Sequence, residues 1–149
     1  MSANKKILEV NNMHTAFRIK DDYYDAVDDV SFELYENEVL AMVGESGCGK
    51  STLATTIMGL HNMNYTQISG EVIYNGENIL NYTEAQFNEL RGGEIGMIFQ
   101  DPLASLNPLM RIGEQIEEAL LYHTDLDKKQ RQAKAVDLLK KVGIENAEV

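Results

Sequence analysis

Gly44-Glu-Ser-Gly-Cys-Gly-Lys-Ser51 has the spacing of a phosphate-binding loop, in which four variable residues separate a glycine from Gly-Lys-Ser. We expect Gly44, Gly47 and Gly49 to adopt positive φ, which lets the backbone approach phosphate oxygens closely. The loop amides then point inward as a nest for anions, and a helix beginning at Lys50 aims its positive end at the same place. The stretch therefore predicts a site for ATP or a close relative.

The expected nucleotide site extends one residue beyond this motif. Lys50 reaches the β- and γ-phosphates, the Ser51 hydroxyl is placed to ligate Mg²⁺, and Thr52 can hydrogen-bond the α-phosphate. Cys48 occupies a variable position of the loop, and we expect no redox role for it. The predicted site comprises Gly44, Glu45, Ser46, Gly47, Cys48, Gly49, Lys50, Ser51 and Thr52.

The residues on either side of the loop predict an α/β arrangement. Val39–Val43 is continuously apolar, which is typical of a strand buried on both faces of a parallel sheet. Residues 50–60 favour a helix, because Leu53, Ile57 and Leu60 share one face. Ile95–Phe99 is a second short apolar run, and we interpret it as another buried strand.

The N-terminal part has the pattern of half-buried antiparallel strands. Residues 7–10, 15–19 and 26–34 alternate between apolar and polar side chains, and residues 20–25 are polar and turn-like. Residues 69–76 predict a further strand bounded by glycine turns.

The C-terminal part favours helices. Thr83-Glu-Ala-Gln86 has the form of a capping box and predicts the start of a short helix. After Pro108, apolar residues recur at helical spacing in two segments, and Asp127 is the expected cap of the second.

The composition excludes some classes of function. The chain has 149 residues, one cysteine and a formal net charge of -11, so an internal disulfide is impossible and a general nucleic-acid binder is disfavoured. We expect no N-terminal signal segment, since residues 1–6 are polar and no apolar run follows them. The longest apolar run, Val39–Val43, is far shorter than a membrane span, so a membrane role would require a partner.

Three segments carry a resemblance to a known family. Residues 26–32, 42–53 and 69–76 occur in the order of the N-terminal half of an ABC transporter ATPase subunit, which residues 7–122 resemble as a whole. Residues 98–108, Ile-Phe-Gln-Asp-Pro-Leu-Ala-Ser-Leu-Asn-Pro, are similar to the Q-loop of the dipeptide, oligopeptide and nickel importer ATPases. The resemblance implies a partial P-loop domain of the α/β class.

The resemblance also divides the chain into parts. It implies an antiparallel β part in residues 1–38 and 68–80, a phosphate-loop core in 39–60, a Q-loop in 94–108 and the start of a helical subdomain in 109–149. The whole of residues 1–149 then corresponds to a truncated nucleotide-binding domain.

The family assigns roles to further residues. Gln100 corresponds to the Q-loop glutamine, whose amide oxygen would ligate Mg²⁺ and sense the γ-phosphate, and the following loop would face a coupling helix of the permease. An aromatic residue upstream of the phosphate loop stacks on adenine in this family. Phe17 aligns best with it, and Tyr24 and Tyr23 are rivals.

The implied setting is an import motor. The cofactors would be ATP and Mg²⁺, and the partners transmembrane permease subunits, a second ABC ATPase subunit and, indirectly, an extracytoplasmic solute-binding protein. The location would be the cytoplasmic face of a prokaryotic cell membrane, and the cargo would be peptides or related small solutes.

Several catalytic motifs of the family are missing. The sequence holds no LSGGQ-like signature and no apolar run ending in Asp-Glu, and the family gives His14, His61 and His123 no catalytic role. We therefore predict that this chain alone hydrolyses ATP negligibly and, with uncovered apolar strands at 39–43 and 95–99, tends to associate. The alternatives are a stand-alone module that binds nucleotide or permease without hydrolysis, and a P-loop kinase or GTPase.

Overall fold

The computed structural model describes residues 5–147, and the chain divides into two compact units, residues 1–87 and residues 88–149. The first unit is built on a four-stranded sheet with the strand order β2-β1-β3-β4. Its elements are β1 (Lys6–Ile19), β2 (Asp22–Tyr35), α1 (Lys50–Ile57), β3 (Thr66–Tyr74), β4 (Glu77–Asn78) and the 3₁₀ turn η1 (Ile79–Asn81). The helix α2 (Glu84–Leu90) begins in this unit.

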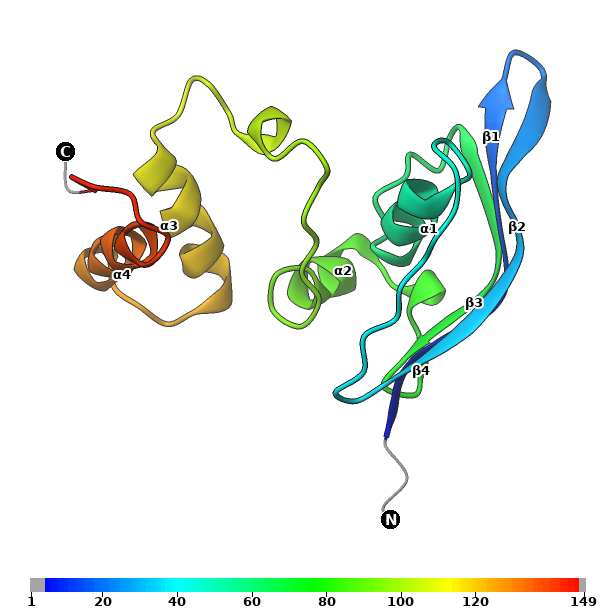
Figure 1. Ribbon diagram of the computed structural model, residues 1–149, viewed down its shortest axis with the longest axis horizontal. Coiled ribbons are helices and arrows are strands. Elements are labelled where there is room, and N and C mark those ends of the chain that lie inside the picture. Colours follow the sequence, from blue (N-terminus) through cyan, green and yellow to red (C-terminus); the bar gives the residue numbers. More distant parts are fainter. Residues whose placement is uncertain (1–4, 148–149) are drawn as a thin grey trace. The chain divides into compact units, whose positions relative to one another are not determined.

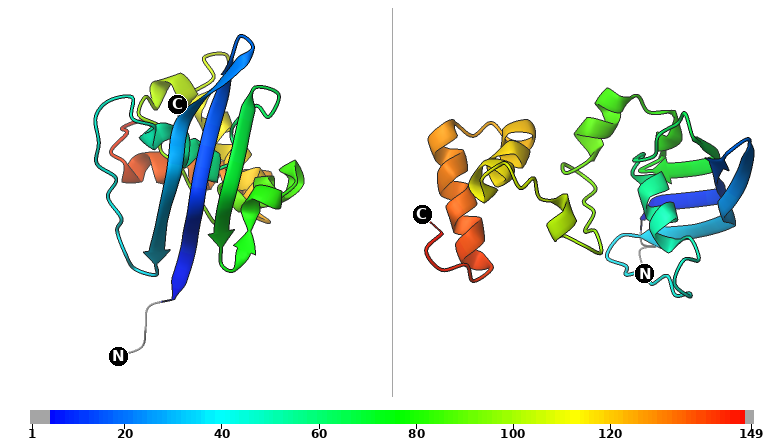
Figure 2. Two further views of the ribbon diagram at one scale, coloured as in Figure 1. Left: turned by 90° about the vertical axis from the view of Figure 1, so that its right-hand side faces the viewer. Right: turned by 90° about the horizontal axis from the view of Figure 1, so that it is seen from above.

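All strand pairs of the sheet are antiparallel, and its three long strands lie side by side in the left view of Figure 2. The two separate strands expected at 7–10 and 15–19 are one strand, β1, and the turn expected over 20–25 is confined to residues 20–21. β1 stays continuous through its polar middle because its pairing with β2 is irregular between Val10 and Thr15. Asn12 and Asp29 both have positive φ there, and Asn12 Nδ2 donates to Asp29 Oδ1 at 2.8 Å.

The helix α1 covers one face of this sheet (Figure 1), as the apolar spacing after the phosphate loop predicts. Leu53, Thr56 and Ile57 are the buried residues of α1, since positions three and four apart share a helix face. The predicted face is wrong at Leu60, which is 43% exposed because the helix already ends at Ile57. The core of the unit also contains Val10, Met13, Val27, Val72, Ile79 and Phe87.

The two strands expected at Val39–Val43 and Ile95–Phe99 are absent from the fold of residues 5–147. Both segments lack regular secondary structure, and Val39 and Ile98 are each 93% exposed. An apolar composition favours burial of a segment. A strand also needs a neighbouring strand whose backbone can hydrogen-bond its amides and carbonyls. In the described part of the chain, no strand pairs with either segment.

The second unit contains the 3₁₀ turn η2 (Leu103–Ser105) and two helices, α3 (Ile112–His123) and α4 (Lys128–Lys141), which pack as a hairpin (Figure 2, right). The predicted cap of α4 is confirmed, because Asp127 Oδ1 accepts from Gln130 N at 2.9 Å. The predicted capping box of α2 is also confirmed by the hydrogen bonds between Thr83 and Gln86. Each helix of residues 5–147 falls short of the length and apolarity that crossing a bilayer requires.

Candidate functional site

The phosphate loop uses its glycines in two different ways. Gly47 has φ 83° and Gly49 has φ 91°, so both adopt the left-handed conformation that glycine tolerates. The positive φ expected at Gly44 is wrong. Gly44 instead provides space, because a Cβ there would lie 2.6 Å from Cys48 Sγ.

Lys50 places its ammonium group inside this loop. Its Nζ donates to the carbonyl oxygens of Gly44 at 2.8 Å and Glu45 at 2.7 Å. It also donates to Cys48 Sγ at 3.2 Å, and this hydrogen bond lowers the pKa of the Cys48 thiol. The loop thus holds an exposed positive charge on its backbone carbonyls, and such a charge suits an anionic ligand.

The loop is held against β2 at its second half. A Cβ on Gly49 would lie 2.2 Å from the carbonyl oxygen of Ala26, so only glycine permits this approach. Gly49 begins α1 without a side-chain cap, and the first amides of a helix have no partner within the helix. Ser51 and Thr52 follow in the first turn, with Ser51 exposed. This donor set fits the phosphate groups of a nucleotide.

The aromatic residues proposed for adenine lie on β1 and β2. Phe17 pairs with Tyr24 across the two strands, and Arg18 pairs with Tyr23. Directly opposed residues share a face of a sheet and successive residues alternate, so Phe17 and Tyr24 lie on one face and Tyr23 on the other. Phe17 is on the face covered by α1, because its ring contacts His61, which follows α1. The register therefore favours Phe17 and Tyr24 over Tyr23.

Gln100 lies in the second unit, where it is exposed. The loop after it is ordered by local hydrogen bonds. Asp101 Oδ1 accepts from Leu103 N at 3.1 Å, and the side chain of Gln115 bonds the backbone of Asn107 through Oε1 at 2.9 Å and Nε2 at 3.0 Å. A shared magnesium site of Gln100 and Ser51 stays a prediction.

His61 is a residue that the motifs do not single out. Its ring contacts Phe17 and its Nε2 contacts the end of α1, so it lies between two predicted parts of the nucleotide site. Phe17 and His61 are far apart in the sequence, and no local pattern connects them. Only the packing of α1 on the sheet brings the two rings together.

The sequence matches the family model described as ABC transporter over residues 27–149, and the chain belongs to this family. The resemblance to this family, inferred from residues 26–32, 42–53 and 69–76, is therefore confirmed.

Among curated proteins, the chain is 46% identical over 143 residues to the oligopeptide transport ATP-binding protein OppD of Lactococcus lactis subsp. cremoris (strain SK11), covering 96% of this chain and 42% of that protein. It is 45% identical over 148 residues to the dipeptide transport ATP-binding protein DppD of L. lactis subsp. cremoris (strain MG1363), with coverages of 99% and 42%. The chain thus spans about two fifths of the length of these relatives.

Solved structures share the fold. The dimeric ATP-binding cassette MJ0796, in a post-hydrolysis state bound to ADP and Pi, superimposes with a TM-score of 0.79. That comparison covers 94% of this chain and 59% of the cassette at 23% identity. The expected partial P-loop domain is therefore confirmed at the level of the fold.

Proposed function

We propose that this chain is the ATP-binding part of an ABC importer ATPase that energises the uptake of dipeptides, oligopeptides or related small solutes. Membership of the ABC transporter family supports the ATP-binding role. The peptide cargo is supported by the relatives, whose names describe oligopeptide and dipeptide transport ATP-binding proteins.

The observation that carries the proposal is the position of Lys50. Its ammonium lies within a loop shaped by two left-handed glycines, at the start of α1. In the proposed complex, Lys50 and the loop amides hold the β- and γ-phosphates, and Thr52 holds the α-phosphate. Ser51 and Gln100 would hold Mg²⁺, which neutralises phosphate charge when bound. The adenine would stack on Phe17.

This chain by itself is proposed to bind ATP without turning it over. Phosphoryl transfer depends on positioning and charge stabilisation, and a carboxylate that orients the attacking water is part of that arrangement. The sequence contains the phosphate loop but no apolar run ending in Asp-Glu and no signature motif. The family resemblance also implies that the signature motif of a second ATPase subunit would close on the γ-phosphate. The proposed partners are a second such subunit, transmembrane permease subunits at the cytoplasmic face of the membrane and, through them, a solute-binding protein.

Calorimetric titration of the 149-residue chain with Mg-ATP tests the binding, with Lys50→Ala as the comparison. We expect saturable binding by the unaltered chain and a large loss in the variant. Phosphate release by the unaltered chain should match that of Lys50→Ala. A folded chain that does not bind ATP would overturn the binding proposal, and phosphate release well above that of the variant would overturn the proposed inactivity.

Uptake of a labelled oligopeptide by cells carrying Lys50→Ala in the chromosomal gene tests the cargo, with lost uptake as the expected result.

A further inference from the structure

We propose that His61 positions Phe17 for stacking on the nucleotide base by fastening its ring to the phosphate-loop helix. This inference rests on the proposed function, because it assigns a role within the same ATP site. It makes His61 a positioning residue rather than a group that touches ATP.

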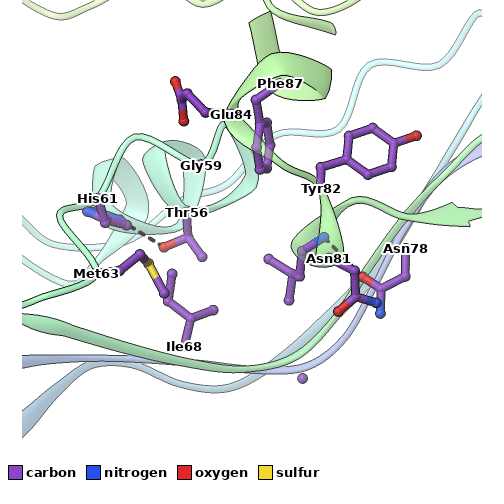
Figure 3. Close-up of a pocket in the computed structure, with 12 residues that line it drawn as sticks. Thr56, Gly59, His61, Met63, Ile68, Asn78, Asn81, Tyr82, Glu84 and Phe87 are labelled. Carbon is purple, nitrogen blue, oxygen red and sulfur yellow. Dashed lines mark hydrogen bonds between the residues drawn. The ribbon is translucent and has the colours of Figure 1, made fainter.

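One side of His61 is anchored to the last turns of α1. Its Nε2 lies 3.1 Å from Thr55 Oγ1, 3.0 Å from Thr56 Oγ1 and 3.3 Å from the carbonyl oxygen of Thr52. Figure 3 shows the imidazole directed at Thr56, beside a pocket of about 350 Å³. These contacts fix His61 to the helix that begins at the phosphate loop. One of the contacted residues, Thr52, is also the expected α-phosphate contact.

The other side of His61 meets the proposed adenine platform. The His61 and Phe17 rings have centroids 5.2 Å apart and planes inclined at 75°, which is an edge-to-face contact. Aromatic pairs favour this geometry over a face-to-face sandwich. Phe17 is only half-buried, so the residue keeps some exposed surface.

A second contact between β1 and α1 lies close to the contact of Phe17 with His61. Thr15 and Phe17 lie two residues apart on the same face of β1, and Thr15 Oγ1 is 3.0 Å from Thr56 Oγ1. The contacts from Thr15 to Thr56, then to His61 and Phe17, form a closed circuit between β1 and α1. The circuit sets the position of the Phe17 ring relative to the helix that carries the phosphate site.

The energetic consequence concerns the base and not the phosphates. A side chain that is immobilised only on binding costs affinity, whereas a ring already held in place does not. Loss of His61 should therefore weaken ATP binding by about three- to tenfold, the range expected for an aromatic pair. Binding of inorganic tripolyphosphate, which has no base, should change by less than about twofold, since it has no stacking contact to lose.

The test titrates the 149-residue chain and its variants with Mg-ATP and, separately, with Mg-tripolyphosphate. His61→Ala and Phe17→Ala should each lose affinity for ATP only. In the double variant the losses should not add, because His61 acts through Phe17. His14→Ala is the matched control, since His14 lies on the same sheet but pairs with Asp28 at 3.0 Å, and it should bind both ligands normally.

Two conservative variants separate the contacts of His61. His61→Phe keeps an aromatic edge for Phe17 but loses the hydrogen bonds to α1, so it should recover only part of the ATP affinity. His61→Gln keeps a hydrogen-bonding group for α1 without a ring, and it should resemble His61→Ala. Recovery by His61→Phe is a result that a general loss of folding would not produce.

The possible failures are distinguishable. Equal losses of ATP and tripolyphosphate in His61→Ala, or full ATP affinity in that variant, would overturn the positioning role and leave the proposed function intact. Normal ATP binding by Phe17→Ala would overturn the positioning role as well. A folded unaltered chain that binds neither ligand would overturn the proposed function together with this inference.

Discussion

The Oγ1 atoms of Thr15 in β1 and Thr56 in α1 lie 3.0 Å apart, and both residues are fully buried. Thr56 has further partners, because its hydroxyl also bonds the Thr52 carbonyl at 2.8 Å and lies 3.0 Å from His61 Nε2. For the Thr15 hydroxyl, Thr56 is the hydrogen-bond partner that the structure shows. The pair joins α1 to the sheet through a polar contact inside an apolar core.

Thr56→Val should therefore destabilise the chain more than Thr15→Val does. The first change leaves a buried hydroxyl on Thr15 without its partner, at a cost of about 1–3 kcal/mol. The second leaves Thr56 with the Thr52 carbonyl and His61. Urea unfolding followed by circular dichroism measures both. The double variant should be no less stable than Thr56→Val, because no orphaned hydroxyl remains, and a larger cost for Thr15→Val would contradict this account.

Lys50→Ala should weaken Mg-ATP binding by about ten- to a hundredfold, since hydrogen bonds to a charged group contribute about 1.5–3 kcal/mol. Lys129→Ala is the matched control, because it removes an exposed lysine of α4. Fluorescence titration with a nucleotide analogue measures both variants. Equal affinities in the two variants would show that the charge inside the loop does not bind phosphate.

Gly49→Ala should be more damaging than Gly47→Ala. Both positions have positive φ, so both substitutions incur the left-handed cost of about 1–2 kcal/mol. Only at Gly49 would the added Cβ also meet backbone, at 2.2 Å from the Ala26 carbonyl oxygen, whereas nothing lies within 4 Å at Gly47. Thermal unfolding and ATP titration should both rank the variants in this order, and a reversed order would mean that the loop is not held by β2.

The alkylation of Cys48 should depend on Lys50. The hydrogen bond from Lys50 lowers the pKa of this thiol, so the reactive thiolate forms at lower pH than for an ordinary cysteine. In Lys50→Ala the pKa rises again, and the pH profile of the iodoacetamide reaction should shift to higher pH. Cys48 is the single cysteine of the chain, so mass spectrometry of the whole protein reports the rate directly. Identical profiles would contradict the contact.

The exposed apolar segments should make the chain associate. Val39 and Ile98 are each 93% exposed in segments without regular secondary structure, and exposed apolar residues favour contacts with other chains. Light scattering should show a mass that grows with concentration, and Val39→Lys or Ile98→Lys should reduce this growth. Val142→Lys is the control, because Val142 is 75% exposed but caps a helix. A monomer at all concentrations would contradict the prediction.

Features governed by neighbouring residues could be predicted from the sequence. The capping box of α2 and the Asp127 cap of α4 each join residues three positions apart, so the backbone that they stabilise is also the backbone that positions them. The phosphate loop is equally local. Its left-handed glycines at 47 and 49, its lysine and the start of its helix lie within a few residues of one another, and the structure shows all of them.

Other expectations failed because they depended on distant partners. Val39–Val43 and Ile95–Phe99 have the composition of buried strands, but composition does not supply the neighbouring backbone that a strand requires. The sequence predicts two strands where the structure has the single strand β1. The pairing of β1 is irregular near Asn12, and the Asn12–Asp29 hydrogen bond to β2 that supports this region cannot be read from the sequence around Asn12.

The sequence by itself determined that this chain belongs to the ABC transporter family and contains the phosphate-loop motif, because that motif consists of closely spaced residues. Only the tertiary structure decided which aromatic residues share the face covered by α1, and that His61 meets Phe17. Those relationships arise when a helix packs on a sheet and brings distant residues together. Burial of Leu53 and Ile57 drives that packing, and it acts between segments rather than within one.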